Sequence, residues 1–188
     1  MSTFFVFITG APGVGKTTII KRLAEELRLT SDRVSGFYTE DVRNRRGKRI
    51  GFDVVTLDSL FRGVLARKDR TGITSKRKVG HFFVDTTTLD KLLLPIIASR
   101  DAVDILIIDE IGKMEVESDI FRKFISGIIT TEEKSYKLVL ATVPLVTSKR
   151  IVKKIRCVSN SKTFLVTKSN RTAIYDEIRT TVTADLLI

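Results

Sequence analysis

A glycine-rich stretch near the start of the chain could bind a phosphate chain. In "GAPGVGKTT", the residues Gly10, Gly15, Lys16 and Thr17 satisfy the pattern G-x-x-x-x-G-K-[ST]. The backbone N–H groups of such a loop turn toward phosphates, the lysine adds a positive charge, and the threonine hydroxyl is a suitable Mg²⁺ ligand. The pattern predicts nucleoside-triphosphate binding; the alternative is a glycine-rich turn with a helix-capping threonine.

We expect the nucleotide to contact every residue of this loop. The predicted contacts are Gly10, Ala11, Pro12, Gly13, Val14, Gly15, Lys16, Thr17 and Thr18.

Two adjacent carboxylates follow a second apolar stretch, "DILIIDE", which ends in Asp109 and Glu110. Open α/β sheets bind ligands at the carboxyl ends of their strands, so we expect Asp109 to hold the magnesium together with Thr17. Glu110 would then orient the attacking water and accept its proton, as a hydrolase requires. The alternatives are a turn-capping Asp109 and a solvated Glu110.

The elements around these motifs alternate between strands and helices. A buried strand over 4–9 precedes the loop and an amphipathic helix over 17–29 follows it. Two extended segments flank Gly47 and predict an antiparallel hairpin. Further strands are expected over 62–67, 81–85, 103–110, 136–143 and 162–168, a basic loop over 68–78, and helices over 87–100, 118–130, 148–156 and 170–182.

This order predicts an α/β fold, with a mostly parallel sheet covered by helices on both faces and the hairpin as an antiparallel addition. A chain of 188 residues is the size of one domain, and we expect residues 1–188 to form it as a monomer. The opening apolar run is too short for a signal peptide or a membrane span. With the single cysteine, Cys157, this predicts a cytoplasmic protein without membrane contacts.

Six segments together resemble the small P-loop nucleoside-triphosphatases typified by the human cancer-related nucleoside-triphosphatase and its archaeal and thermophilic bacterial relatives. They are "GAPGVGKTT", "GFYTEDVR", "GKRIGFDVV", "KVGHFFVD", "IIDEIGKME" and "VTKSNR". The resemblance implies a RecA-like fold and slow, Mg²⁺-dependent hydrolysis of ATP, GTP, CTP and UTP to diphosphate and phosphate. It implies Lys16 and Thr17 in the phosphate and metal site, with Asp109 and Glu110 as the acidic pair. Asp41 departs from the family, which usually has glutamate there.

The transition state for γ-phosphate cleavage usually needs a further cation. Arg43, Lys113, Arg156 and Arg171 are candidates, and position after a strand end favours Lys113 and Arg171, although each alone is more often a solvated surface charge. The segment "TKSN" is similar to the T-K-x-D loop that reads guanine, but Asn170 could accept only through its carbonyl, and the loop could equally begin the last helix.

The net charge of +11 leaves two other functions open. A phosphotransferase acting on a nucleoside, a nucleotide or an RNA end is one. The other is an NTPase that binds nucleic acid weakly through basic clusters such as "RNRRGKR", "RKDR", "SKRK" and "SKRIVKKIR". The sequence shows little aromatic interleaving and therefore no evident platform for stacking single-stranded bases.

Overall fold

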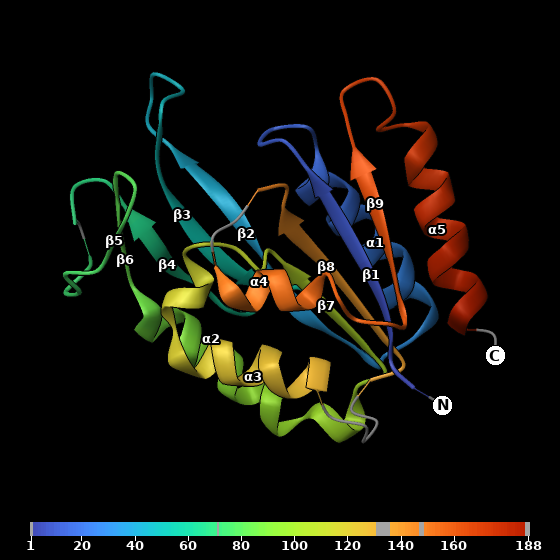
Figure 1. The fold of residues 1–188 in the computed structure, drawn as a ribbon. Coiled ribbons are helices and arrows are strands. Elements are labelled where there is room, and N and C mark those ends of the chain that lie inside the picture. Colours follow the sequence, from blue (N-terminus) through green and yellow to red (C-terminus); the bar gives the residue numbers. More distant parts are fainter. Residues whose placement is uncertain (1, 71, 131–135, 147–148, 187–188) are drawn as a thin grey trace.

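In the computed structural model, the described residues (2–70, 72–130, 136–146 and 149–186) form nine strands in one mixed sheet (Figure 1). The strands are β1 (Phe4–Gly10), β2 (Val34–Arg43), β3 (Arg49–Thr56), β4 (Arg62–Arg67), β5 (Lys78–Val79), β6 (Phe82–Val84), β7 (Ile105–Asp109), β8 (Leu138–Pro144) and β9 (Ser161–Val166). Their order in the sheet is β5-β6-β4-β3-β2-β7-β8-β1-β9. The predicted α/β class is confirmed.

The functional edge of the sheet belongs to its parallel half, which runs from β2 through β7, β8 and β1 to β9. Because these strands run in one direction, their carboxyl ends meet at a single edge. Gly10 is opposite Pro144, and Tyr38 is opposite Asp109. The phosphate loop and the acidic pair therefore leave the same edge, separated by β8.

Helices cover both faces of the sheet, as predicted (Figure 1). The helices are α1 (Lys16–Thr30), α2 (Thr86–Ala98), α3 (Asp119–Thr130), α4 (Arg150–Ile155) and α5 (Ala173–Leu186), with short 3₁₀ turns at Arg100–Ala102 and Glu115–Glu117. Side chains alternate along β1, so Val6 and Ile8 pack under α1 and α5, whereas Phe5 and Phe7 pack on the side of α2, α3 and α4.

The other half of the sheet is an antiparallel extension made of β3, β4, β6 and β5. The predicted hairpin is β2–β3, and Gly47 at its tip has a φ of 73°. The prediction of a loop over 68–78 was wrong at its end, since Lys78 begins β5. That two-residue strand forms only by pairing with β6, and no local pattern signals it. The predicted basic helix begins at Arg150, and Ser148 lies outside the described residues.

A ladder of charges connects α1 to the extension. Arg62 donates to Glu40 at 2.6 Å and to Asp53 at 2.9 Å, while Arg67 donates to Asp53 at 2.5 Å. Lys21 of α1 pairs with Glu40. Glu40 and Asp53 are directly opposite each other on β2 and β3, so the arginines neutralise a like-charge pair that would otherwise repel.

We predict that Asp53→Ala destabilises the protein by about 3 kcal/mol, because it leaves the largely buried Arg67 without its carboxylate partner. The free energy of unfolding in urea measures this. The control is Glu177→Ala, which breaks an exposed pair with Lys162 and should cost less than about 1 kcal/mol. Equal losses in the two variants would contradict a structural role for the ladder.

Candidate functional site

The phosphate loop joins β1 to α1 and is shaped by its glycines. A Cβ on Gly10 would lie 2.3 Å from the carbonyl oxygen of Val166, so no larger residue fits there. Gly15 has a φ of 108° and directly precedes α1, whose first N–H groups are available to an anion. The Lys16 ammonium donates to the carbonyl oxygens of Gly10 and Ala11, at 3.1 and 3.3 Å. Its charge is therefore held over the loop.

The remaining loop residues differ in exposure. Val14 is buried and anchors the loop to the core, whereas Ala11, Pro12, Gly13 and Thr18 are exposed. The exposed residues leave the loop open to a phosphate chain from solvent.

Asp109 ends β7 and is only 2% exposed. One carboxylate oxygen accepts a hydrogen bond from Thr142, and the other is buried without a hydrogen-bond partner in the described structure. Burial raises the pKa of Asp109, while the hydroxyls of Thr142 and Thr17 and the charges of Lys16 and Lys21 act in the opposite direction. The structure thus brings the two predicted metal ligands, Thr17 and Asp109, close together.

A magnesium ion fits these residues. An unpartnered, buried carboxylate oxygen beside a threonine hydroxyl is a hard oxygen donor set of the kind that Mg²⁺ prefers. The described residues contain no cluster of three or more His, Cys, Asp or Glu able to bind a metal. Few protein ligands are expected for Mg²⁺ that is bound mainly by the phosphates of its nucleotide.

Glu110 shares its surroundings with a second glutamate, Glu115, for which the sequence alone indicates no role. A Cβ on Gly112 would lie 2.4 Å from the Glu110 carboxylate and 2.7 Å from that of Glu115, so both carboxylates lie over this glycine. Burial, and then the charge of Asp109, raise the pKa of Glu110, whereas Lys16 lowers it. Glu115 is 4% exposed, and burial together with the charge of Glu110 raises its pKa to about 8. The sequence feature that could have indicated this pair is an acidic residue five positions after Glu110, with Gly112 between them.

Arg156 is the candidate cation for which the structure shows a link to the phosphate loop. Its guanidinium donates to the carbonyl oxygens of Pro144 and Leu145, each at 2.7 Å. Pro144 is opposite Gly10 in the sheet. Arg156 is therefore fixed at the functional edge beside the start of the loop.

The other three candidates have different surroundings. Arg43 pairs with Asp41 at 2.7 Å and donates to the carbonyl of Gly47 at 2.9 Å, so both side chains stabilise the hairpin tip. Lys113 and Arg171 are exposed, and their roles stay predictions.

Asn170 closes the "TKSN" loop on itself. Its side-chain oxygen accepts from the backbone N–H of Thr167 at 2.8 Å, and its side-chain nitrogen donates to the carbonyl of Leu165 at 2.9 Å. Because both ends of the amide bond the backbone, the geometry favours a structural role over guanine recognition.

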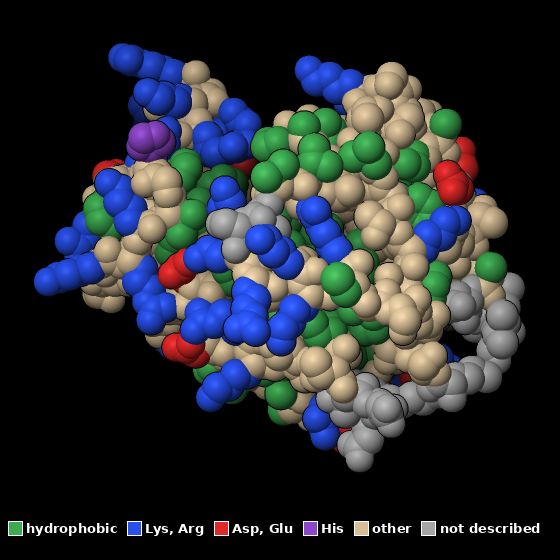
Figure 2. Space-filling model, in the orientation of Figure 1, with side chains coloured by type: hydrophobic (Ala, Val, Ile, Leu, Met, Phe, Trp, Pro, Cys, Tyr) green, Lys and Arg blue, Asp and Glu red, His purple; other side chains and the backbone are tan. Residues whose placement is uncertain are grey.

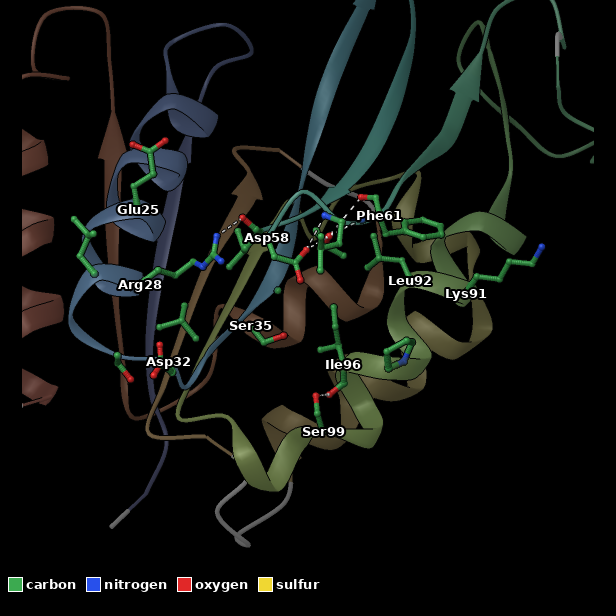
Figure 3. A pocket seen from close by; sticks show the side chains of 18 residues that line it. Glu25, Arg28, Asp32, Ser35, Asp58, Phe61, Lys91, Leu92, Ile96 and Ser99 are labelled. Atoms are coloured by element: carbon green, nitrogen blue, oxygen red, sulfur yellow. Dashed lines mark hydrogen bonds between the residues drawn. The ribbon is translucent and has the colours of Figure 1, made fainter.

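A large cavity of about 910 Å³ lies away from this site, at the amino end of β2. Figure 3 shows Arg28, Phe61 and Ile96 around it, contributed by the end of α1, the β3–β4 connection and α2. Neither the phosphate loop nor the acidic pair lines this cavity. The candidate nucleotide site is instead the open loop at the opposite edge of the sheet.

A phosphate loop after β1, with an acidic residue ending a parallel strand beside it, defines the class of P-loop nucleotide-binding proteins. A family model described as "NTPase" matches residues 5–179, and the chain belongs to this family.

Similar proteins and structures agree with this assignment. The human "Cancer-related nucleoside-triphosphatase" is 51% identical over 82 residues, which cover 43% of this chain and 42% of that protein. "Nucleoside-triphosphatase THEP1" of Thermotoga sp. (strain RQ2) is 48% identical over 80 residues, 43% of this chain and 41% of that protein. The chain thus spans about two fifths of the length of these relatives in the matched segments.

Two solved structures match over a larger part of the chain. The solution structure of a human cancer-related nucleoside triphosphatase has a TM-score of 0.78 and 39% identity, and covers 97% of this chain and 98% of that one. The crystal structure of THEP1 from Aquifex aeolicus has a TM-score of 0.77 and 34% identity, and covers 93% and 96%.

We predict that Glu115→Gln makes stability less dependent on pH. The folded-state pKa of Glu115 is about 8 and the unfolded value is 4.5, so its contribution to stability is fully present below pH 4.5 and is lost as the pH rises through 8. The glutamine of the variant does not ionise. Between pH 4.5 and 8, the free energy of unfolding of the variant should therefore rise relative to that of the parent by a few kcal/mol, at about 1.4 kcal/mol per pKa unit. Urea unfolding at several pH values measures this; parallel curves for variant and parent would contradict it.

We also predict that Thr142→Val lowers Mg²⁺ affinity and turnover, because it removes a hydrogen bond to Asp109 without changing the burial of that carboxylate. The substitution keeps the shape of a fully buried side chain and removes the hydroxyl that donates to the carboxylate. Loss of such an orienting hydrogen bond typically costs about 10- to 100-fold in metal affinity or activity. Mg²⁺ titration of nucleotide binding and turnover should show this loss, with Thr163→Val on the exposed side of β9 as the unaffected control.

Proposed function

We propose that the chain is a Mg²⁺-dependent nucleoside-triphosphate phosphohydrolase that converts NTP and water to NDP and phosphate. The observation that carries this proposal is the position of Glu110, beside Asp109 and within the influence of the Lys16 charge. A carboxylate at that point can orient the water that attacks the γ-phosphate and accept its proton. The names of the human and Thermotoga relatives, both nucleoside-triphosphatases, support the same reaction.

Binding of the nucleotide relies on the loop and its helix. The loop N–H groups and the start of α1 bind the β- and γ-phosphates, and Lys16 adds its charge to theirs. Thr17 and Asp109 would hold Mg²⁺, which would supply positive charge that neutralises the phosphates. Arg156 is the further cation for the transition state, because it is fixed beside Gly10.

The chemical step takes place at Glu110. Its carboxylate accepts a proton from water while the water oxygen bonds to the γ-phosphorus and the bond from that phosphorus to the β–γ bridging oxygen breaks. The bridging oxygen leaves with the diphosphate. The raised pKa of Glu110 makes it a stronger proton acceptor than an ordinary glutamate. Glu115, whose pKa is about 8, keeps its own proton at neutral pH and so adds no second negative charge beside Glu110.

Substrate choice is broad in this proposal, and ATP, GTP, CTP and UTP are all hydrolysed. The engagement of Asn170 with its own loop supports this, since no side chain is then assigned to reading guanine. The RecA-like subclass and a cytoplasmic location belong to the same proposal.

We predict that Glu110→Gln lowers phosphate release by about 100-fold or more while nucleotide affinity is retained, because the substitution removes only the proton acceptor. Phosphate release from the four triphosphates with Mg²⁺ and binding of a fluorescent nucleotide measure the two effects. Lys16→Ala should lose both, and Glu177→Gln on α5 should lose neither. Full turnover in Glu110→Gln would contradict its role, and turnover only after addition of a nucleoside or an RNA end would indicate a phosphotransferase.

A further inference from the structure

The excess positive charge of the protein is concentrated at one end of the sheet. The segments 43–49 and 67–78, here called the basic end, contain eleven of the 33 Lys and Arg residues and one of the 22 Asp and Glu residues. The rest of the chain has 22 basic and 21 acidic residues and is almost neutral. A charge of +10 out of +11 therefore belongs to the hairpin tip and to the β4–β5 connection with its flanking residues.

The hairpin tip presents its cations on an ordered turn. The side-chain oxygen of Asn44 accepts from the backbone N–H groups of Arg46 and Lys48, each at 3.0 Å, and the Asn44 carbonyl accepts from Gly47 at 2.9 Å. Arg45, Arg46 and Lys48 are exposed and pair with none of the described acidic residues. Such unneutralised cations on a fixed turn are suited to a chain of phosphates.

An aromatic ring, Phe83, lies beside the basic end and close to two of its cations, which the sequence did not reveal. Phe83 is directly opposite both Lys78 and Arg67 in the antiparallel extension, so the three side chains share a face of the sheet. The ammonium of Lys78 and the guanidinium of Arg70 lie 5.2 and 5.3 Å from the centre of the Phe83 ring. Phe82 points to the other face, where it packs on the core near α2. Phe83 is partly exposed, so part of its ring faces solvent.

The hairpin tip, though not the outer strands, lies on the side of the sheet where the phosphate loop is (Figure 1). Figure 1 shows the β2–β3 tip rising from the same side of the sheet as the loop between β1 and α1. Figure 2 shows Lys and Arg side chains gathered over that tip and over the outer strands. The exposed large apolar side chains of the described structure all lie outside the basic end, so it has none to insert into a membrane.

We infer that the basic end binds single-stranded nucleic acid. Its cations contact successive phosphates, and an unpaired base stacks on the solvent-facing part of the Phe83 ring beside Arg70 and Lys78. Duplex bases are already stacked on each other and cannot use the ring, whereas every single-stranded base presents a face to it. Binding is independent of nucleotide hydrolysis, because no residue of the phosphate loop or the acidic pair takes part.

Fluorescence anisotropy tests this with labelled oligo-dT and oligo-rU of about twelve nucleotides, near the upper end of known site sizes. We expect the affinity to fall steeply as the salt concentration rises. In a variant with Arg45, Arg46 and Lys48 changed to Ala, the slope of log binding constant against log salt concentration should be smaller by about 2, because each lost phosphate contact contributes ~0.7. Phe83→Leu should bind about tenfold more weakly and Phe83→Trp should retain affinity, since only the latter can stack.

A matched variant with Lys123, Lys153 and Lys154 changed to Ala removes the same charge from α3 and α4 and should bind like the parent. Phosphate release should be unchanged in the hairpin-tip variant, which shows that the protein remains folded. The proposal is overturned if the matched variant loses as much affinity as the hairpin-tip variant, if a duplex of equal charge binds as tightly, or if only vesicles containing anionic lipid bind.

Discussion

The site depends on a carboxylate that the fold removes from water. Asp109 is 2% exposed, and an ionised carboxylate in such a place is costly unless charges and donors surround it. Thr142 bonds one oxygen, while Thr17, Lys16 and Lys21 act on the group from α1. The negative charge at the end of β7 and the positive start of α1 therefore stabilise each other. This attraction keeps the phosphate loop beside the acidic pair.

This requirement connects the phosphate site to the rest of the molecule. Lys21 belongs to the same helix as Thr17, and its ammonium lies 4.0 Å from the centre of the Tyr38 ring and pairs with Glu40. Glu40 is in turn paired with Arg62 of the antiparallel extension. A charge network thus runs from the helix that begins at the phosphate loop to the outer strands. Neither half of the sheet is electrostatically independent of the other.

The parts predicted from the sequence are those with a local physical signature. The loop glycines, the apolar strand before Asp109 and the amphipathic helix after Lys16 each follow from backbone freedom or from periodicity within a few residues. The roles of Thr142 and Glu115 could not be predicted, because they depend on contacts across the sheet and within an irregular turn. The surroundings of Phe83 could not be predicted for the same reason, since Arg70 and Lys78 lie apart from it in the sequence and approach it only when the outer strands pair.

The hairpin has a further consequence for how the fold can vary. β2 pairs with β7 only from Val34 to Tyr38, whereas it pairs with β3 from Phe37 to Arg43. The outer half of the hairpin therefore extends beyond the end of β7, and there β2 pairs with β3 alone. Residues inserted or deleted in matched pairs at its tip would alter its reach by about 3.3 Å per residue while preserving which face each side chain occupies. The length of this overhang can therefore change without disturbing the strand that ends in Asp109.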